Sequence, residues 1–260
     1  MWIPRVIPCL LLHKGGLYKT VEFKNPRYVG DPINAVRILN EKEVDELLLV
    51  DIDATVEGRE PRYDQVEDIV GEAFMPVAYG GGVKSVAQMH RLFALGVEKV
   101  FTSAAALAAP SLVSDAASRF GSQSIGVTLD LKRGRAGAEP VVVTHNSRKK
   151  ANLAPIEAAR LMEEHGAGEL LVNSVDRDGT MSGYDLGAIR QITQAVSIPV
   201  VALGGAGSLD DLSRATREGG ASAAAAGSLF VFTGVHRAVL ITYPAQTEIE
   251  RLFGGGHDGT

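Results

Sequence analysis

The chain carries the same order of motifs in its two halves, and this repeat restricts the possible folds more than any other feature. Val50–Asp53 matches Val175–Asp178 at a separation of 125 residues. Two further pairs follow in the same order: Met75-Pro76 with Ile198-Pro199, and Gly80-Gly81 with Gly204-Gly205. Each half therefore contains an apolar strand with an acidic end, a helix, a strand ending in glycines, another helix and a strand ending in small residues. A repeat of this kind sets the architecture before any single residue is considered.

Apolar runs alternate with longer amphipathic stretches along the chain, which predicts βα units and a parallel sheet. Strands are expected near Arg5–Leu11, Glu46–Ile52, Val77–Tyr79, Lys99–Thr102, Ser124–Leu129, Glu169–Asn173, Val200–Leu203 and Ala223–Ala226. Helices are expected at about Pro32–Lys42, Tyr63–Ala73, Val86–Leu95, Ser111–Phe120, Ala154–His165, Leu186–Val196, Leu209–Glu218 and His236–Leu252.

Eight such units predict a closed (β/α)8 TIM barrel with a twofold internal half-barrel repeat. An open, doubly wound sheet is the alternative, but the repeat favours closure because two half-barrels complete one barrel. We expect a single barrel over residues 1–253 and a flexible, glycine-rich tail at 254–260.

Composition argues against several classes of protein. The net charge of −5 is unlike that of a nucleic-acid binder, which usually carries a basic surplus. The apolar run Val6–Leu12 contains Pro8 and is too short to span a membrane; a buried strand explains it better than a signal peptide does. A single cysteine, Cys9, excludes an internal disulfide and is typical of a reducing compartment, so we expect a cytoplasmic protein. We expect no cofactor and no metal, because the sequence has neither a dinucleotide fingerprint nor a His/Cys metal spacing.

Glycine clusters end three of the expected strands. Gly80–Gly82 follows strand three, Gly204–Gly207 follows strand seven, and Ala226–Ser228 follows strand eight, where a short helix could begin. Glycine lets backbone N–H groups approach an anion closely, and the loops after strands seven and eight are the habitual phosphate site of a TIM barrel. Clusters on opposite sides of the barrel predict two phosphate sites; tight turns without a ligand are the alternative.

Carboxylates gather at the same end of the expected strands. Five acids share this position: Asp51 and Asp53 after strand two, Asp130 at the end of strand five, and Asp176 and Asp178 after strand six. Acids that converge on one barrel mouth are costly unless they bind, titrate or pair with a cation. Lys19 is the candidate counter-charge or substrate contact.

The repeat also compares strand one with strand five, and this places Leu11 opposite Asp130. A symmetric ancestor with acids at both places is one possibility. On that interpretation the chain keeps one acid and has an apolar side chain at the other position. A leucine can neither take nor give a proton.

Charges of alternating sign begin four strands at the other end of the expected barrel: Arg5, Glu46, Lys99 and Glu169. As isolated residues they are solvated strand-end charges, whereas together they could close a ring across the barrel bottom. Two segments, 14–28 and 132–150, are too long for plain βα turns and would lie at the opposite face, where barrel active sites are built. For the second segment, which is rich in Lys and Arg, a charged hairpin and a mobile loop over an anionic substrate are both open.

These residues give the chain its resemblance to a known family. From Arg5 to about Phe232 it is similar to the cyclase subunit of imidazole glycerol phosphate synthase. The motifs that carry the resemblance are Arg5-Val-Ile-Pro-Cys-Leu, Gly30-Asp-Pro, Asp45-Glu-Leu, Glu57-Gly-Arg, Gly80-Gly-Gly, Phe120-Gly-Ser-Gln, Gly166-Ala-Gly-Glu, Asp176-Arg-Asp-Gly-Thr, Gly183-Tyr-Asp-Leu and Gly204-Gly-Ala-Gly. The resemblance implies a barrel that docks a glutaminase at its N-terminal face, admits ammonia through a charged gate and uses it at the other face to cyclise a bisphosphorylated ribulosyl-formimino substrate.

The resemblance also implies roles for residues of this chain. The gate falls on Arg5, Glu46, Lys99 and Glu169. The phosphate-binding positions are Gly81, Gly82, Ser103, Gly205, Gly227 and Ser228. The catalytic candidates are Asp130, Asp178 and Lys19, with Asp51 and Asp176 as further acids of the substrate site.

Three positions depart from the family pattern. One of the two family aspartates that act as general acid and base falls on Asp130, but the other falls on Leu11. The family asparagine after strand four falls on Ser103, and the serine before the strand-seven glycines falls on Leu203. On this comparison the ammonia route is retained and the substrate end is altered. Loss of one member of an acid–base pair commonly lowers the rate about 10²–10⁴-fold, and Asp130 and Asp178 remain.

Three functions stay open. The stretches Cys9–Leu12, Glu22–Tyr28 and Gly227–Phe232 are similar to a divergent branch of the family found with surface-polysaccharide genes, where barrel and glutaminase are thought to supply ammonia to a sugar amidotransferase; we expect this chain to act in that way. The second is a genuine cyclase, a lyase of histidine biosynthesis, and the third is a non-catalytic scaffold that activates a glutaminase. The expected partners are a glutaminase, a phosphorylated small molecule and, on the first hypothesis, a sugar amidotransferase, with no nucleic acid and no membrane.

Overall fold

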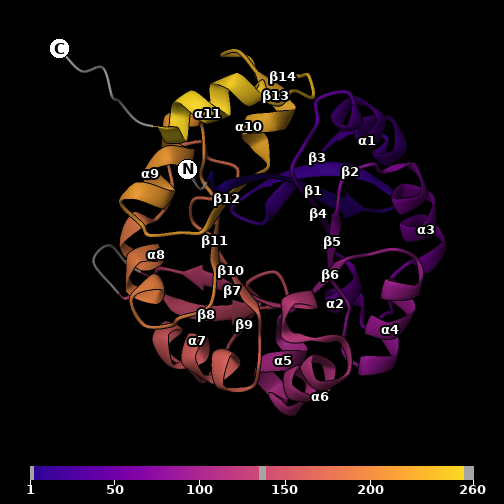
Figure 1. Cartoon of the computed structure of the whole chain (residues 1–260), viewed down its shortest axis with the longest axis vertical. Coiled ribbons are helices and arrows are strands. Elements are labelled where there is room, and N and C mark those ends of the chain that lie inside the picture. Colours follow the sequence, from indigo (N-terminus) through magenta and orange to yellow (C-terminus); the bar gives the residue numbers. More distant parts are fainter. Residues whose placement is uncertain (1–2, 135–138, 255–260) are drawn as a thin grey trace.

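The computed structural model describes residues 3–134 and 139–254. Its barrel strands are β1 (Arg5–His13), β4 (Leu47–Asp51), β5 (Val77–Gly80), β6 (Lys99–Thr102), β7 (Ile125–Lys132), β10 (Glu169–Ser174), β11 (Val200–Leu203) and β12 (Ala223–Ala226). In this part of the chain these eight parallel strands lie side by side in that order, and β12 pairs with β1 to close the ring. Figure 1, viewed along the barrel, shows the helices surrounding the strands. The predicted (β/α)8 barrel is confirmed.

Helices connect successive strands on the outside. The longer ones are α1 (Pro32–Asn40), α3 (Tyr63–Glu72), α4 (Val86–Ala94), α6 (Ser111–Phe120), α7 (Pro155–Glu164), α8 (Leu186–Thr193), α9 (Leu209–Arg217) and α11 (Gln246–Gly254), and the short ones are α2 (Ala54–Glu57), α5 (Ala104–Ala108) and α10 (Ser228–Val231). Side-chain caps set several starts. Asp31 accepts a hydrogen bond from the backbone of Asn34 at 3.0 Å before α1, and Ser208 forms a reciprocal capping box with Asp211 before α9.

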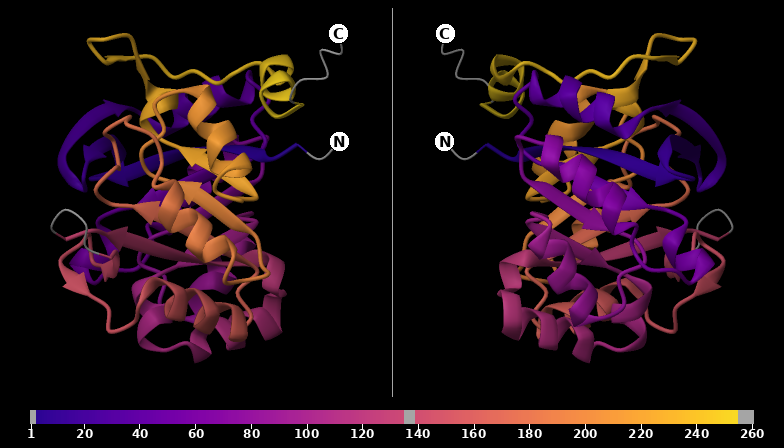
Figure 2. Two further views of the ribbon diagram at one scale, coloured as in Figure 1. Left: turned by 90° about the vertical axis from the view of Figure 1, so that its left-hand side faces the viewer. Right: turned by 90° about the vertical axis from the view of Figure 1, so that its right-hand side faces the viewer.

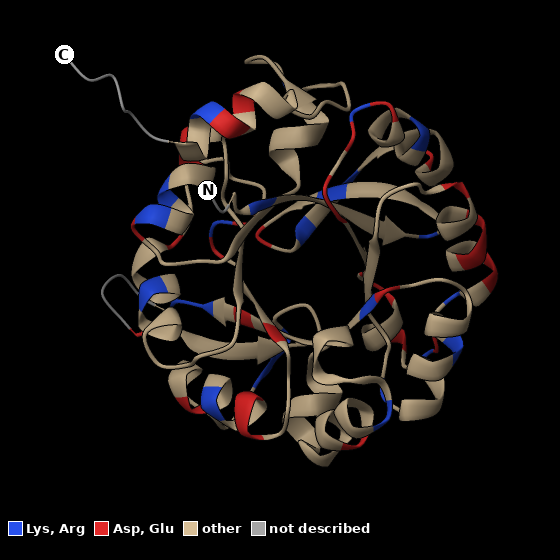
Figure 3. Cartoon of the chain, viewed as in Figure 1, with Lys and Arg blue, Asp and Glu red and all other residues tan. Residues whose placement is uncertain are grey.

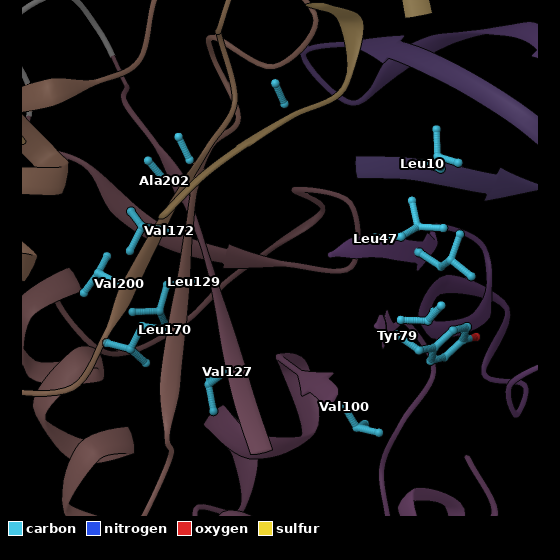
Figure 4. Close-up of a cluster of buried hydrophobic side chains, with 14 of the residues drawn as sticks. Leu10, Leu47, Tyr79, Val100, Val127, Leu129, Leu170, Val172, Val200 and Ala202 are labelled. Carbon is cyan, nitrogen blue, oxygen red and sulfur yellow. The ribbon is translucent and has the colours of Figure 1, made fainter. Parts of the chain in front are cut away.

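Two apolar layers stabilise the barrel. Because side chains alternate along a strand, one set points outward and packs under the helices, including Leu10, Leu129 and Leu170; Figure 4 shows part of this layer around the strands. The other set fills the barrel interior and consists mainly of small or aliphatic residues: Ile7, Cys9, Leu48, Ala78, Phe101, Leu171, Val201, Leu203, Ala223 and Ala225, with Leu11 and Val50 packed against them. The interior is therefore narrow and apolar between its two ends.

Two antiparallel hairpins extend the barrel at the C-terminal ends of the strands. β2 (Gly16–Val21) and β3 (Lys24–Gly30) follow β1, and β8 (Val141–Thr144) and β9 (Lys149–Lys150) follow β7. Figure 2 shows both on the same side of the molecule, away from the start of the chain. The two long segments of the sequence are thus hairpins in matching positions of the two halves.

One predicted helix is wrong over much of its length. Residues 236–252 were expected to be helical, but β13 (Phe232–Thr233) and β14 (Ala238–Val239) form a hairpin, and the helix spans Gln246–Gly254. Arg237 lies in the left-handed region, at φ 49°, and donates hydrogen bonds to the carbonyls of Gly179 and Thr180 at 3.2 and 3.1 Å. Pro244 also disfavours a helical residue before it. Gly254 ends α11, and the rest of the predicted tail lies outside the described residues.

Lys and Arg residues and Asp and Glu residues are spread along the outer ring of helices (Figure 3). None of the helices in the described part of the chain is both long and apolar enough to cross a membrane.

Candidate active site

A cavity of about 430 Å³ lies at the C-terminal ends of the barrel strands. It brings together these predicted site residues: Lys19, Asp51, Gly81, Gly82, Ser103, Asp130, Asp178 and Gly227. Asp176, Gly205 and Ser228 do not line it. Asp176 instead accepts a hydrogen bond from the backbone N–H of Arg133 at 2.6 Å. The mouth predicted from the glycine clusters and acids is thus a cavity, but only part of the predicted set lines it.

Asp130 lines the cavity from the end of β7. Burial raises the pKa of its carboxyl group to about 7, and the nearby Asp178 adds to this, while the Asn173 amide opposes it. The Nδ2 of Asn173 donates to the Oδ1 of Asp130 at 3.0 Å, because Asn173 pairs directly with Asp130 in the β10–β7 register. A carboxyl group with a pKa near 7 can both release and accept a proton at neutral pH, which suits general acid–base chemistry.

Asp178 and Lys19 line the same mouth. Thr20 donates from Oγ1 to Asp178 at 2.9 Å. Burial raises the pKa of Asp178, although Lys19 and Thr20 counteract the rise. Lys19 donates to the carbonyl of Cys9 at 2.6 Å, and burial lowers the pKa of its amine. These groups can hold and move protons beside an anionic ligand.

The other acids of the mouth are already paired. Arg59 donates to both carboxylate oxygens of Asp51, at 2.7 and 2.8 Å, so Asp51 orients an arginine and caps the turn after β4. Asp53 accepts from the Lys14 backbone at 3.0 Å and contacts His13 Nδ1 at 2.6 Å. These pairings account for why five acids can share one end of the barrel.

Leu11 projects from β1 into the cavity. It packs beside Val50, its neighbour in the β1–β4 register. This is the place that the repeat matches with Asp130, and the structure puts an apolar surface there. The cavity therefore has the titratable Asp130 and Asp178 from the second half of the chain and the apolar side chains of Leu11 and Val50 from the first.

Both hairpins close over the mouth. The backbone N–H of Glu22 donates to the carbonyl of Asp178 at 2.9 Å, so β2–β3 leans on the loop after β10. Asn146, between β8 and β9, donates from Nδ2 to the carbonyl of Ile52 at 2.8 Å, and so reaches the loop after β4. His145, Asn146 and Ser147 are consecutive left-handed residues with φ of 54°, 53° and 64°, a costly turn that brings His145 and Asn146 to the cavity.

Four charged side chains close the opposite end of the barrel. Arg5 forms ion pairs with both Glu46 and Glu169. The Nζ of Lys99 lies 2.5 Å from the Oε2 of Glu169 and 3.7 Å from the Oε1 of Glu46. The two glutamates are buried. The ring alternates in sign, so each charge has an opposite neighbour, which is what stabilises ions removed from water.

The sequence matches a known protein family over most of its length. Residues 5–236 match the family described as "Histidine biosynthesis protein". The chain belongs to this family. A protein of Pseudomonas aeruginosa, provisionally named imidazole glycerol phosphate synthase subunit hisF2, is 50% identical over 246 residues, which is 95% of this chain and 98% of that protein. Similar proteins with the same provisional kind of name occur in Leptospira borgpetersenii, at 47% identity over 96% of this chain and 98% of theirs, and in Vibrio vulnificus, at 47% over 94% of each.

The membership confirms the family resemblance drawn from the motifs.

The cavity also contains residues that were not predicted from the sequence. Asn173, Thr20, Arg59 and Lys84 all line the cavity of this histidine biosynthesis family member. Strand alternation could have found Asn173, since Glu169, Leu171 and Asn173 share one face of β10. Arg59 and Lys84 lie in loops and carried no comparable pattern. No group of three or more His, Cys, Asp or Glu side chains within the described residues is placed to hold a metal ion.

Proposed function

We propose that this chain is the barrel subunit of an ammonia-transferring pair, which receives ammonia from a glutaminase and passes it through the barrel to an acceptor. The observation that carries the proposal is the ring of Arg5, Glu46, Lys99 and Glu169 at the bottom of a small, apolar interior. Neutral ammonia is small and loses little on entering such an interior, whereas ions are excluded by desolvation. The names of the relatives, which describe synthase subunits, support a partner subunit.

The acceptor is the second part of the proposal. Leu11 faces Asp130 across the cavity, so the chain lacks the second acid expected of a cyclase at that place. We propose that the ammonia serves a sugar amidotransferase in polysaccharide biosynthesis and that the chain works as one barrel over residues 1–253 in the cytoplasm. Cys9 is a free, buried thiol, in keeping with a reducing compartment.

A specific observation favours one alternative, a genuine cyclase of histidine biosynthesis. Asp130 keeps a pKa of about 7, so one acid–base group remains tuned to neutral pH. A cyclase would then need another group, such as Asp178, to replace the side chain lost at Leu11. A scaffold that only activates a glutaminase is the remaining alternative.

The deciding experiment measures cyclisation of the ribulosyl-formimino bisphosphate with saturating ammonium salt, which bypasses the glutaminase. We expect turnover about 10²–10⁴-fold below that of a competent cyclase, partly restored by Leu11→Asp. Near-normal turnover by the unaltered chain would establish the cyclase alternative.

A second measurement tests the partner. The glutaminase subunit encoded nearest to this chain is mixed with it, and glutamine hydrolysis is followed with and without Lys99→Ala. We expect the barrel to stimulate hydrolysis. Neighbouring genes for glycan synthesis would support the sugar acceptor, and rescue of a histidine-requiring strain that lacks the cyclase would contradict it.

A further inference from the structure

A phenylalanine forms part of the cavity floor above the charged ring. Phe101 lies two residues after Lys99 on β6, so the two side chains share the inward face of that strand. Leu48 and Leu171 stand in the same relation to the two glutamates of the ring. All three apolar residues line the cavity. Because alternate strands of a TIM barrel supply the side chains of one layer, these residues of β4, β6 and β10 form the layer on which the cavity rests.

Phe101 is flanked by a glycine on each neighbouring strand. It pairs with Gly80 of β5 on one side and with Gly126 of β7 on the other. A Cβ on Gly126 would lie 2.3 Å from Cε1, 2.4 Å from Cδ1 and 2.9 Å from Cζ of Phe101. A Cβ on Gly80 would come no closer than 3.5 Å, to the Cβ of Phe101. The aromatic ring therefore leans toward β7 and lies against the backbone of Gly126.

The place where the aromatic ring lies is next to the charged ring. Gly126 pairs with Phe101 on one side and with Glu169 on the other. Without a side chain at Gly126, and with only Ala78 on β5, the interior would be open at this level. The phenyl group fills that space, and Phe101 is only 3% exposed. A glycine inside a strand weakens the strand and often marks a close approach, and here the approaching group is the Phe101 ring.

The buried charges give this packing a physical role. Glu46 and Glu169 are buried, whereas the cavity above them, of about 430 Å³, is large enough to hold water. Water that passed the floor would find carboxylates to bind and would link the cavity to the charged ring. An apolar constriction prevents this because water and ions lose their hydrogen bonds on entering it, while a small neutral molecule loses much less.

We infer that Phe101, lying against Gly126, is an apolar seal between the cavity and the charged ring. The seal keeps water and ions of the cavity away from the charged ring and admits a small neutral molecule such as ammonia. Phe101 thus determines what the interior of the barrel admits. The inference rests on the proposed function for the identity of the molecule that passes, whereas the exclusion of water is a property of the barrel alone.

NMR of the chain labelled in its Ile and Val methyl groups tests the seal without glutaminase or ammonia. The methyl groups of Ile7 and Val201 are the reporters, because both residues belong to the interior and neither lines the cavity. We expect no cross-peaks between water and these methyl groups in the unaltered protein. Phe101→Ala should produce them, because it opens the cavity onto buried carboxylates that bind water.

Leu11→Ala is the control for this measurement. It removes another apolar side chain from the cavity wall but leaves Phe101 in place, so the reporters should stay dry. Thermal unfolding shows that each variant is folded. Water cross-peaks in the unaltered protein, their absence from folded Phe101→Ala, or equal cross-peaks in Leu11→Ala would overturn the inference. A dry interior in a chain that fails to stimulate the glutaminase would contradict the proposed function and leave the seal standing.

A second pair of variants tests the contact with Gly126 and does not depend on the folding of Phe101→Ala. Gly126→Ala places a methyl group where the aromatic ring lies and should lower the melting temperature by about 3–10 °C, as expected for an overpacked core. Gly80→Ala makes the same change on the other side of Phe101, where the space allows it, and should lower the melting temperature less. An equal loss in the two variants would show that the aromatic ring does not lie on Gly126 and would overturn the inference.

Discussion

The two halves of the barrel are most alike at its bottom and least alike at its top. Glu46 and Glu169 begin matching strands and bind the same two cations. At the other end, Leu11 matches Asp130, and Gly81 and Gly82 line the cavity whereas Gly205 does not. The difference teaches that the two halves are alike at the end facing the proposed ammonia source and unlike at the end that forms the cavity.

The hairpins show the same contrast in their contacts. β2–β3 crosses from the first half to the loop after β10, and β8–β9 crosses from the second half to the loop after β4. Each hairpin thus contacts a loop of the other half of the barrel. The contacts are unequal in effect, because Lys19 of β2 lies over Gly227, whereas Gly81 and Gly82 line the cavity.

The largest expected effect is on the pH dependence of stability. It comes from two single substitutions, Asp130→Leu and Leu11→Asp, each of which gives one half of the barrel the residue of the other half. The folded state raises the pKa of Asp130 to about 7, so its contribution to stability is present below the unfolded pKa of about 4 and is lost as pH rises through 7. Between pH 4 and 8, Asp130→Leu should therefore gain on the order of 4 kcal/mol relative to the unaltered protein, and Leu11→Asp should lose stability over the same range.

Urea unfolding across this pH range measures both changes. Leaving the Asn173 amide without its acceptor adds a cost to Asp130→Leu that does not depend on pH and shifts the whole curve. Parallel curves for the unaltered protein and Asp130→Leu would show that burial does not perturb this carboxyl group.

The second prediction tests whether the bottom is as symmetric as it looks. Glu169 binds Arg5 and lies 2.5 Å from Lys99, whereas Glu46 lies 3.7 Å from Lys99. Glu169→Gln should lower the free energy of unfolding by about 3 kcal/mol, and Glu46→Gln by about 1 kcal/mol less, because each leaves cations partly unpaired. Urea unfolding at pH 7 compares the two, and an equal loss would mean that the ring does not distinguish the halves.

The third prediction concerns the titratable acids of the second half. Asn173→Ala removes the hydrogen bond that favours charged Asp130 and should raise the pKa of that acid by about one unit above its value near 7. Carbon-13 NMR of labelled aspartate side chains follows the titration. Thr20→Val is the control, because it should raise the pKa of Asp178 more than that of Asp130; a pKa of Asp130 unchanged by Asn173→Ala would rule out this contact.

The smallest expected effect concerns the hairpin tips. Asn146→Gly keeps the left-handed backbone but removes the bond to Ile52, which should speed amide exchange in β8–β9 about fivefold, as for the loss of about 1 kcal/mol. Thr20→Val should do the same in β2–β3. If exchange in β8–β9 rises equally in both variants, the hairpins open together and the comparison between them fails.

Much of the fold could be predicted from the sequence, because the internal repeat and the spacing of apolar residues indicate which side chains are buried. The barrel strands follow from those patterns, and Asp31 and Ser208, residue types that favour helix starts, cap α1 and α9. The stretch after α10 could not be predicted in this way. Its path depends on Arg237 reaching carbonyls of the loop after β10, a contact between distant parts of the sequence.

The site was predictable to the extent that it lies on strand ends. Glycines and acids that follow strands pointed to the mouth, and Asp130 lies there. Which of them line the cavity depends on how loops fold back: Asp176 turns to Arg133, and Gly205 is covered from the loop after β10. Lys84 and Arg59 reach the cavity from loops. Loops have no regular alternation from which the direction of a side chain could be predicted.

The barrel closes at β12, a strand whose residues have little intrinsic preference for β structure. β12 consists of four alanines, Ala223–Ala226, and alanine favours helices over strands. Its register joins residue 5 to residue 223 and matches β11 over only two residue pairs. Pairing between such distant segments carries a high loop-closure cost. We therefore expect closure of the ring at β12 to come late in folding and β12 to be among the first barrel strands to separate on unfolding.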